Sequence, residues 1–195
     1  EEYFTPTPEI FDHPIAVLSG PSSGSSGDYN LFRMRFHPMA RIFGKKSNGA
    51  YTAGFLNSNL GVLNGYFYRV DHGQIYSNYN GEGFLMHKSF PVDEEVWLTQ
   101  EGAATGEDDV VGRAMEWINT LAYAHSPDAN KTELNAGGDS VTITATVRNP
   151  LSHSISVSAL LTDLNGVLVD SAHFLNDSLH GDGSAGDSIW GCFLK

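Results

Sequence analysis

The chain has 195 residues, 41% hydrophobic and 17% charged, which is enough apolar side chain for a packed core. Its formal net charge of −12 at pH 7 argues against a nucleic-acid partner, because affinity for a phosphate backbone depends on clustered Lys and Arg. The single cysteine, Cys192, excludes an internal disulfide and any cysteine-cluster metal site. No segment approaches the roughly 18 consecutive apolar residues of a membrane span. The first residues lack signal-peptide character, so the protein is predicted to be cytosolic or to have lost its signal.

Residues 1–28 are predicted to form an extended tail, a short strand and a Gly/Ser loop. The loop reads GPSSGSSGD and contains a formal G-x-S-x-G pattern around Ser22. In hydrolases this pattern marks a nucleophilic serine, provided that a helix follows immediately. The next residues, YNLFRMRFH, alternate as a strand does. The loop is therefore interpreted as a flexible turn.

Residues 29–104 are predicted to form a β-rich unit. Short aromatic runs such as GVLNGYFYRV and EEVWLT are separated by Gly, Asn and Asp, which is typical of an antiparallel sheet, sandwich or barrel. One helix is predicted over residues 105–126, where Thr105 can cap the start and Val111, Met115 and Ile118 recur at helical spacing. The fold class expected for the chain is mainly β, with this helix between two β units.

Residues 127–195 contain β-branched, alternating runs joined by turn residues, which predicts an immunoglobulin-like sandwich. The runs include DSVTITATVRNP and LTDLNGVLVDS, and the stretch over residues 176–191 reads NDSLHGDGSAGDSIWG. Together these segments resemble accessory immunoglobulin-like domains of secreted bacterial surface proteins, whose closing stretch has the form DDGxHGDGxAGDGIWG. Asn176 and Ser178 depart from that pattern.

The resemblance implies a non-catalytic β-sandwich that spaces, anchors or docks other domains. Members of that family continue for one or two strands beyond the closing stretch, whereas only CFLK follows here. The resemblance therefore implies a sandwich without its last strands. Either the chain is a fragment, or a strand is supplied from elsewhere, because an open sheet edge can pair with an added strand.

The closing stretch is also a candidate metal site, since hard cations such as calcium bind clustered carboxylate oxygens. The candidate ligands are Asp163, Asp177, Asp182 and Asp187. The alternative, which the spacing favours, is that each Asp bonds its own backbone in consecutive tight turns. The same stretch contains a formal G-x-G-x-x-G, but no helix follows it, so a dinucleotide loop is not predicted. No cofactor other than calcium is suggested.

Exposed aromatics are a candidate surface for polysaccharide or protein partners, namely Tyr66, Tyr68, Tyr76 and Tyr79. Packing in the sheet core is the alternative. The eight histidines form no H-x-H or H-E-x-x-H motif, so a zinc site would have to be assembled from distant parts of the chain.

The sequence as a whole is interpreted as a non-catalytic structural or adhesive protein, extracellular or at the cell surface. Its expected partners are further copies of itself or other domains of a larger surface protein, and strand exchange could assemble it into a polymer. The alternative function is a glycan-binding, accessory fragment of a larger secreted hydrolase. No combination of nucleophile, base and orienting group at a believable spacing predicts an enzyme.

Overall fold

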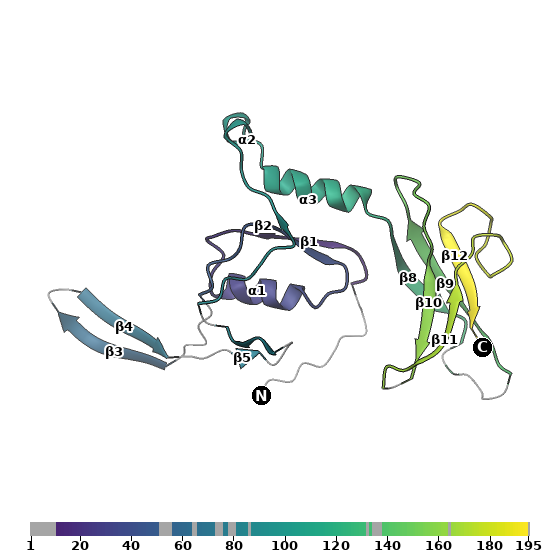
Figure 1. Ribbon diagram of the computed structural model, residues 1–195, viewed down its shortest axis with the longest axis horizontal. Coiled ribbons are helices and arrows are strands. Elements are labelled where there is room, and N and C mark those ends of the chain that lie inside the picture. Colours follow the sequence, from purple (N-terminus) through teal and green to yellow (C-terminus); the bar gives the residue numbers. More distant parts are fainter. Residues whose placement is uncertain are drawn as a thin grey trace. The chain divides into compact units, whose positions relative to one another are not determined.

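In the computed structural model (Figure 1), the chain is mainly β, as expected, and the described part has three helices and several separate sheets. The structure describes residues 11–50, 56–63, 66–72, 76–77, 81–85, 87–131, 133, 138–163 and 165–194, with backbone alone for 56–63, 66–72 and Tyr76. The chain divides into two compact units. One is Pro14–Ile118, called the αβ unit below; the other contains the remaining residues and is called the β unit.

The αβ unit is built on a parallel sheet, which corrects the expectation of a purely antiparallel one. Strand β1 (Ile15–Ser19) pairs in parallel with β2 (Ala40–Gly44), and β2 pairs in parallel with β7 (Glu94–Glu95). Helix α1 (Ser26–Met34) lies between β1 and β2 in the sequence. Parallel neighbours need such a crossover, so β1, α1 and β2 form a β-α-β unit.

The two faces of this sheet have separate cores, because successive residues of a strand point to opposite faces. On one face, Val17 and Ile42 pack with Leu31 of α1. On the other face, Phe43 packs with residues of helix α3 (Asp109–Thr120), among them Val110 and Ala114. Figure 1 shows α1 and α3 on opposite sides of β1 and β2. The unit therefore has helices on both faces of the sheet.

Smaller antiparallel elements complete the αβ unit. Strands β3 (Leu56–Leu63) and β4 (Tyr66–His72) pair as a hairpin with an irregularity between Asn59 and Val62. Strands β5 (Tyr76–Ser77) and β6 (Gly83–Phe84) form a second antiparallel pair. The antiparallel expectation therefore holds for these hairpins and not for the central sheet.

The predicted helix is present but begins later than expected. Thr105 does not start it; it is the last residue of a short helix, α2 (Gln100–Thr105), which Gly106 ends with a φ of 79°. The start of α3 is capped by Asp108, whose Oδ1 accepts hydrogen bonds from the N–H groups of Val110 (3.0 Å) and Val111 (3.2 Å). After Thr120 the chain continues as a strand instead of a helix to residue 126.

The β unit contains two sheets. Strands β8 (Tyr123–Ala129), β9 (Val141–Arg148) and β12 (Ile189–Leu194) form an antiparallel sheet in the order β12-β9-β8. Strands β10 (Ser158–Thr162) and β11 (Leu168–His173) form a hairpin. Side chains of both sheets share one small core around Ala145, Phe174 and Cys192, so the two sheets pack face to face.

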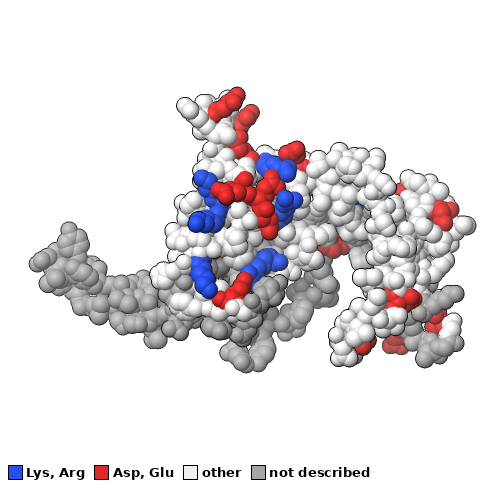
Figure 2. All heavy atoms as spheres, viewed as in Figure 1, with Lys and Arg blue, Asp and Glu red and all other residues white. Residues whose placement is uncertain are grey.

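Charged side chains of the αβ unit pair within the unit. Figure 2 shows Lys and Arg next to Asp and Glu on the visible face. Glu94 lies 3.0 Å from Arg41 and 2.5 Å from Arg113, and Arg35 pairs with Glu82. In the described ranges, no helix has both the length and the apolar character that crossing a bilayer requires.

Candidate functional site

The loop between β1 and α1 is the segment that was interpreted as a flexible turn. Its backbone is held at both ends: Ser23 N–H donates to Gly20 C=O (2.8 Å), and Ser23 C=O accepts from Asn48 N–H (2.8 Å). The hydroxyl of Ser23 also accepts a hydrogen bond from Gly20 N–H (3.2 Å). The loop is therefore an ordered turn, and helix α1 follows it directly.

This helix overturns the reason for which a nucleophilic serine was set aside. A strand was expected after the loop, whereas Ser26–Met34 is helical. The residue at the strand-to-helix turn is not Ser22 but Ser25, which immediately precedes α1. A helix thus follows Ser25 directly, as the nucleophile pattern requires, but Ser23 stands where that pattern has its first glycine.

Ser25 has a strained backbone, and its hydroxyl does not cap helix α1. Its φ is 55° and its ψ is −110°, a conformation that costs a non-glycine residue roughly 1–3 kcal/mol. A serine at this position normally caps the helix through its side chain, but Ser25 makes no such bond. Its side chain is exposed and has no hydrogen-bond partner among the described residues. Local helix stability therefore does not account for this conformation.

The start of α1 places backbone N–H groups beside that hydroxyl. The first N–H groups of a helix have no partner within the helix, and they carry the positive end of its dipole. Gly27 N–H bonds to Gly24 C=O (2.9 Å), and Tyr29 N–H bonds to Ser25 C=O (3.0 Å). The N–H of Ser26 belongs to the residue directly after Ser25, at the end of the helix that carries the positive end of the dipole.

A buried carboxylate fixes this helix start to a neighbouring segment. Asp28, in the first turn of α1, is fully buried, and its Oδ1 accepts a hydrogen bond from Gly49 N–H (3.0 Å). Gly49 has a φ of 78°, and a Cβ there would lie 2.7 Å from the carbonyl carbon of Lys88. Ser47 extends this link, since its hydroxyl accepts from Phe90 N–H (2.7 Å). These hydrogen bonds connect the start of α1 to Gly49, and Ser47 to Phe90.

A depression of about 820 Å³ lies beside the turn. Its wall includes Pro21 and Asn48, which a hydrogen bond of 3.4 Å joins, together with Lys45 and Lys46. The depression is large enough for several residues of a polymer or for a small molecule. In the described part of the chain, no imidazole bonds to the Ser25 hydroxyl.

The acidic closing stretch folds as a self-bonded loop between β11 and β12. Asp182 is fully buried, and its carboxylate accepts hydrogen bonds from the N–H groups of Asp177 (2.6 Å), Ser178 (2.9 Å) and His180 (3.1 Å). Asn176 bonds across the loop to Gly186 N–H (2.8 Å). Asp182 is thus the centre on which the loop folds.

The other three aspartates also bond backbone groups nearby. Asp177 Oδ1 accepts from Leu179 N–H (3.0 Å), and Asp187 Oδ1 accepts from Ile189 N–H (2.7 Å). Asp163 lies in the β10–β11 turn and accepts from the N–H groups of Asn165 and Val167, both at 2.8 Å. Among the described residues, the four carboxylates do not form a group within ligand distance of one another. The bonds are those of turn-forming aspartates.

Calcium binding by Asp163, Asp177, Asp182 and Asp187 stays a prediction, and a melting experiment tests it. Because the carboxylates already accept backbone hydrogen bonds, we expect chelator-treated protein to melt at the same temperature with and without millimolar CaCl2. A rise in melting temperature that MgCl2 does not reproduce and that Asp187→Asn removes would instead show a calcium site.

The loop predicts acid sensitivity of the β unit. Burial by itself raises the pKa of Asp182, but the N–H groups of Ser178, His180 and Asp177 hold it below its ordinary value of 3.8. The pKa of Asp177 is also lowered, first by the side chain of His180 and then by Leu179 N–H. The folded chain therefore binds these protons less tightly than the unfolded chain does. The two ionised carboxylates therefore contribute their full stabilisation of the folded β unit above about pH 4. This contribution is lost as the pH falls through the pKa values that Asp177 and Asp182 have in the folded chain.

We expect Asp182→Asn to lower the melting temperature at pH 7, because an amide NH2 would face backbone N–H groups. Between about pH 4 and pH 2, the melting temperature of the variant should fall less than that of the wild type, because the variant lacks the carboxylate that becomes protonated. Circular dichroism melts at several pH values measure both effects, with Asp128→Asn on exposed β8 as the control. Parallel pH curves for the wild type and Asp182→Asn would contradict the role given to this carboxylate.

Three of the four tyrosines proposed as a contact surface lie in strands β4 and β5. Tyr66 and Tyr68 lie in β4, where only the backbone is described, and Tyr76 lies in β5 opposite Phe84. Tyr79 is outside the described residues. Polysaccharide binding therefore stays a prediction. Loss of binding on Tyr66→Ala or Tyr68→Ala in a glycan array would support it.

The structure also brings together one group that no sequence motif indicated. Asp12, His13 and His125 place ligand atoms within 4.8 Å of one another in the β unit. His13 and His125 are far apart in the sequence, so their spacing carries no signal. For Ser25, the sequence did show the glycine- and serine-rich loop that contains it, but it did not show the backbone conformation of that loop.

Comparisons with known proteins show no family. No model of a known protein family matches the chain, and no curated protein matches it. Among solved structures, the chain is similar to the crystal structure of a "putative peptidase" from Parabacteroides merdae ATCC 43184, at 21% sequence identity and a TM-score of 0.43. The match covers 54% of this chain and 31% of that chain. A likeness this weak carries no argument about activity.

Proposed function

We propose that the αβ unit carries the nucleophile of a serine hydrolase and that Ser25 is that nucleophile. The observation that carries the proposal is an exposed serine with a φ of 55°, held between a strand of a parallel sheet and a helix, whose hydroxyl does not cap the helix. Strained residues of this kind concentrate at functional sites, and a strand–turn–helix is the setting of a nucleophilic serine. The proposal departs from the sequence-based expectation of a non-catalytic protein, whose alternative was a glycan-binding, accessory fragment of a larger secreted hydrolase.

The chemistry proposed is acyl transfer. The Ser25 oxygen attacks a substrate carbonyl carbon, a base takes the hydroxyl proton, and Ser26 N–H stabilises the oxyanion. Collapse of the intermediate breaks the bond to the leaving group, which receives the proton and leaves an acyl-serine. Water then hydrolyses the acyl-serine and regenerates the hydroxyl.

Hydrolysis assays test the proposal. A panel of chromogenic esters and fluorogenic peptides would be incubated with the wild type, Ser25→Ala and Ser26→Ala. We expect turnover of at least one substrate class, reduced by roughly 10³-fold or more in Ser25→Ala and much less in Ser26→Ala, whose backbone N–H is kept. Equal rates for the wild type and Ser25→Ala would sink the proposal.

A second function is proposed for the β unit, as an immunoglobulin-like, non-catalytic module with a structural or adhesive role at the cell surface. The supporting observation is that the β10–β11 hairpin exposes large apolar side chains, including Leu160 (68% exposed), Val167 (61%) and Val169 (62%). Apolar side chains gathered on one exposed hairpin are typical of a surface that another molecule covers. The proposed occupant is another copy of this chain.

Light scattering at increasing protein concentration tests the adhesive role. We expect the wild type to self-associate and Leu160→Ser with Val169→Ser to shift the equilibrium to monomer. A wild type that stays monomeric at all concentrations would contradict self-association and leave the Ser25 proposal unaffected.

A further inference from the structure

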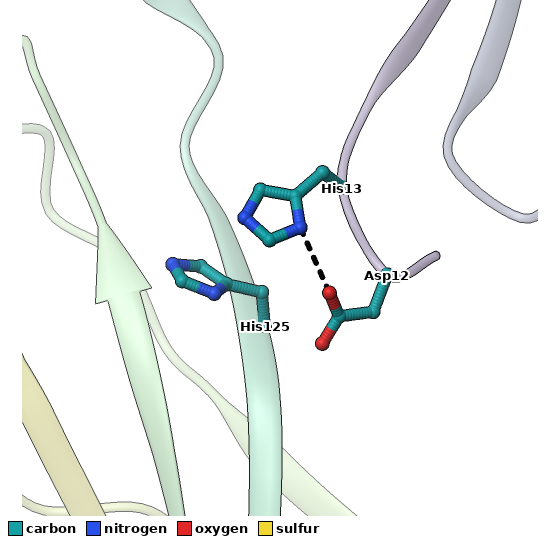
Figure 3. A group of neighbouring side chains, drawn as sticks. All are labelled: Asp12, His13 and His125. Carbon is teal, nitrogen blue, oxygen red and sulfur yellow. Dashed lines mark hydrogen bonds and ion pairs between the residues drawn. The ribbon is translucent and has the colours of Figure 1, made fainter. Parts of the chain in front are cut away.

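Three side chains with metal-binding groups converge in the β unit (Figure 3). Asp12 and His13 lie in the segment that precedes β1, and His125 lies on β8. One ligand atom from each residue lies within 4.8 Å of the other two. Figure 3 shows the His13 and His125 rings next to each other, with the Asp12 carboxylate bonded to His13. All three side chains are half-buried, so an ion from solvent can reach them.

Hydrogen bonds fix the carboxylate of this group. Asp12 Oδ1 lies 2.8 Å from His13 Nδ1, and Asp12 Oδ2 accepts a hydrogen bond from Ser126 N–H. The Ser126 bond is the main reason that the pKa of Asp12 lies below its ordinary value, with a smaller contribution from His13. The carboxylate is therefore charged at neutral pH, which is the form that binds a cation.

An irregularity in β8 positions the third side chain. The pairing of β8 with β9 shifts register between His125 and Asp128, and Ser126 has a φ of 51°. His125 Nδ1 lies 3.0 Å from Ser126 Oγ. Bulges of this kind redirect a side chain and are common next to functional sites. The ring centroids of His13 and His125 are 4.5 Å apart, so the bulge brings the second imidazole directly against the first.

We propose that Asp12, His13 and His125 form a binding site for a divalent transition-metal ion such as zinc. Two imidazoles and one carboxylate are donors that zinc and its neighbours in the first transition series accept. Three protein ligands leave one coordination position for water or another small ligand. This proposal does not depend on Ser25, which lies in the other unit.

The distances suit such an ion after small adjustments. With metal–ligand bonds of about 2.0–2.1 Å in a tetrahedral site, ligand atoms lie roughly 3.3 Å apart. The 2.8 Å between Asp12 and His13 is already this short, and the ion would take the place of the proton shared there. The remaining separations, at most 4.8 Å, close by rotation of partly exposed side chains.

A bound metal ion would hold the segment before β1 against strand β8. Asp12 and His13 belong to the segment before the αβ unit, whereas His125 is part of β8. An ion held by all three joins that segment to the sheet of the β unit by coordination, in addition to the Ser126 hydrogen bond. Bound metal should therefore protect the Asp12–His13 segment from hydrogen exchange.

Isothermal titration of the chelator-treated full chain with ZnCl2 tests the site. We expect saturable binding with one strong site, weakened at least about tenfold in His125→Gln and in His13→Gln. His153→Gln, in the exposed turn after β9, is the matched control and should bind as the wild type does. Substituting Co²⁺ should give visible d–d absorption that the two ligand variants lose.

Two further measurements keep the test independent of folding. Circular dichroism establishes that each variant is folded, and Asp12→Asn provides a third ligand change if either histidine variant is not. At a zinc concentration that saturates only the wild-type site, hydrogen exchange at Asp12 and His13 should slow in the wild type and in His153→Gln but not in the ligand variants. Absence of saturable zinc binding, or equal binding by the wild type and all three ligand variants, would overturn the proposal.

Discussion

Replacing Ser25 by glycine will make the αβ unit more stable and abolish hydrolysis in the same variant. The φ of 55° costs serine roughly 1–3 kcal/mol, whereas glycine adopts this region freely. Glycine also makes the unfolded chain more flexible, which takes back about 0.5–1 kcal/mol. The net gain of about 1 kcal/mol corresponds to a melting temperature higher by roughly 3–5 °C.

Two matched variants separate the strain from the hydroxyl. Ser25→Ala removes the hydroxyl and keeps a side chain in the strained conformation, so it should lose hydrolysis without gaining stability. Ser26→Gly, one residue inside α1, should instead be slightly destabilised, because glycine is unfavourable in a helix. If Ser25→Gly melts at or below the wild-type temperature, the backbone of Ser25 is not strained and the main observation behind the proposed function fails.

Replacing Gly191 by alanine will destabilise the β unit more than the other substitutions proposed for that unit. Gly191 is buried in β12, and a Cβ there would lie 2.1 Å from the backbone oxygen of His180 and 2.9 Å from its carbonyl carbon. The loop and the strand would have to separate, because neither contact is with a flexible side chain. The expected loss is about 3 kcal/mol or more, seen as a melting temperature lower by roughly 10 °C or more.

Gly186→Ala is the control for this prediction. Gly186 lies in the same loop with a φ of 85°, but a Cβ there meets no atom within 4 Å. Only backbone strain opposes the alanine, so the expected loss is about 1–2 kcal/mol. Similar melting temperatures for the two variants would show that the loop does not press on β12 as described.

The sequence could predict the mainly β character but not the helix that positions Ser25. The alternation of Phe32, Met34 and Phe36 suggested a strand, yet Phe32 and Met34 lie in α1 and Phe36 lies in the turn after it. The helical pattern was hidden because a charged residue, Asp28, occupies a buried position one turn before Leu31. A tertiary hydrogen bond from Gly49 N–H stabilises the carboxylate in that position, and no local pattern reveals it.

Helix α3 illustrates the limits of boundary prediction. Its apolar spacing was visible, and the helix is present, but its start was placed four residues too early. Thr105, Asp108 and Asp109 could each cap a helix by residue type, but Gly106 ends α2 directly after Thr105, and Asp108 caps α3. The parallel pairing of β1 with β2 was equally hidden, because short apolar strands look alike in either direction.

The candidate sites differ in how much of them the sequence contained. The four aspartates were found, and with them the alternative that each bonds nearby backbone, which is what their hydrogen bonds show. His13 and His125 could not be paired from the sequence, because the fold and the β8 irregularity bring them together. Ser25 could not be distinguished from Ser22 without backbone angles.

Reaction with a fluorophosphonate, followed by peptide mapping, shows directly whether Ser25 is an activated nucleophile. Such a reagent forms a stable bond with an activated serine, and mass spectrometry identifies the residue that carries it. We expect one adduct per chain, on Ser25, with none on Ser22, Ser23 or Ser26. An adduct on one of those neighbours, or no adduct under conditions in which a known serine hydrolase reacts completely, would contradict it.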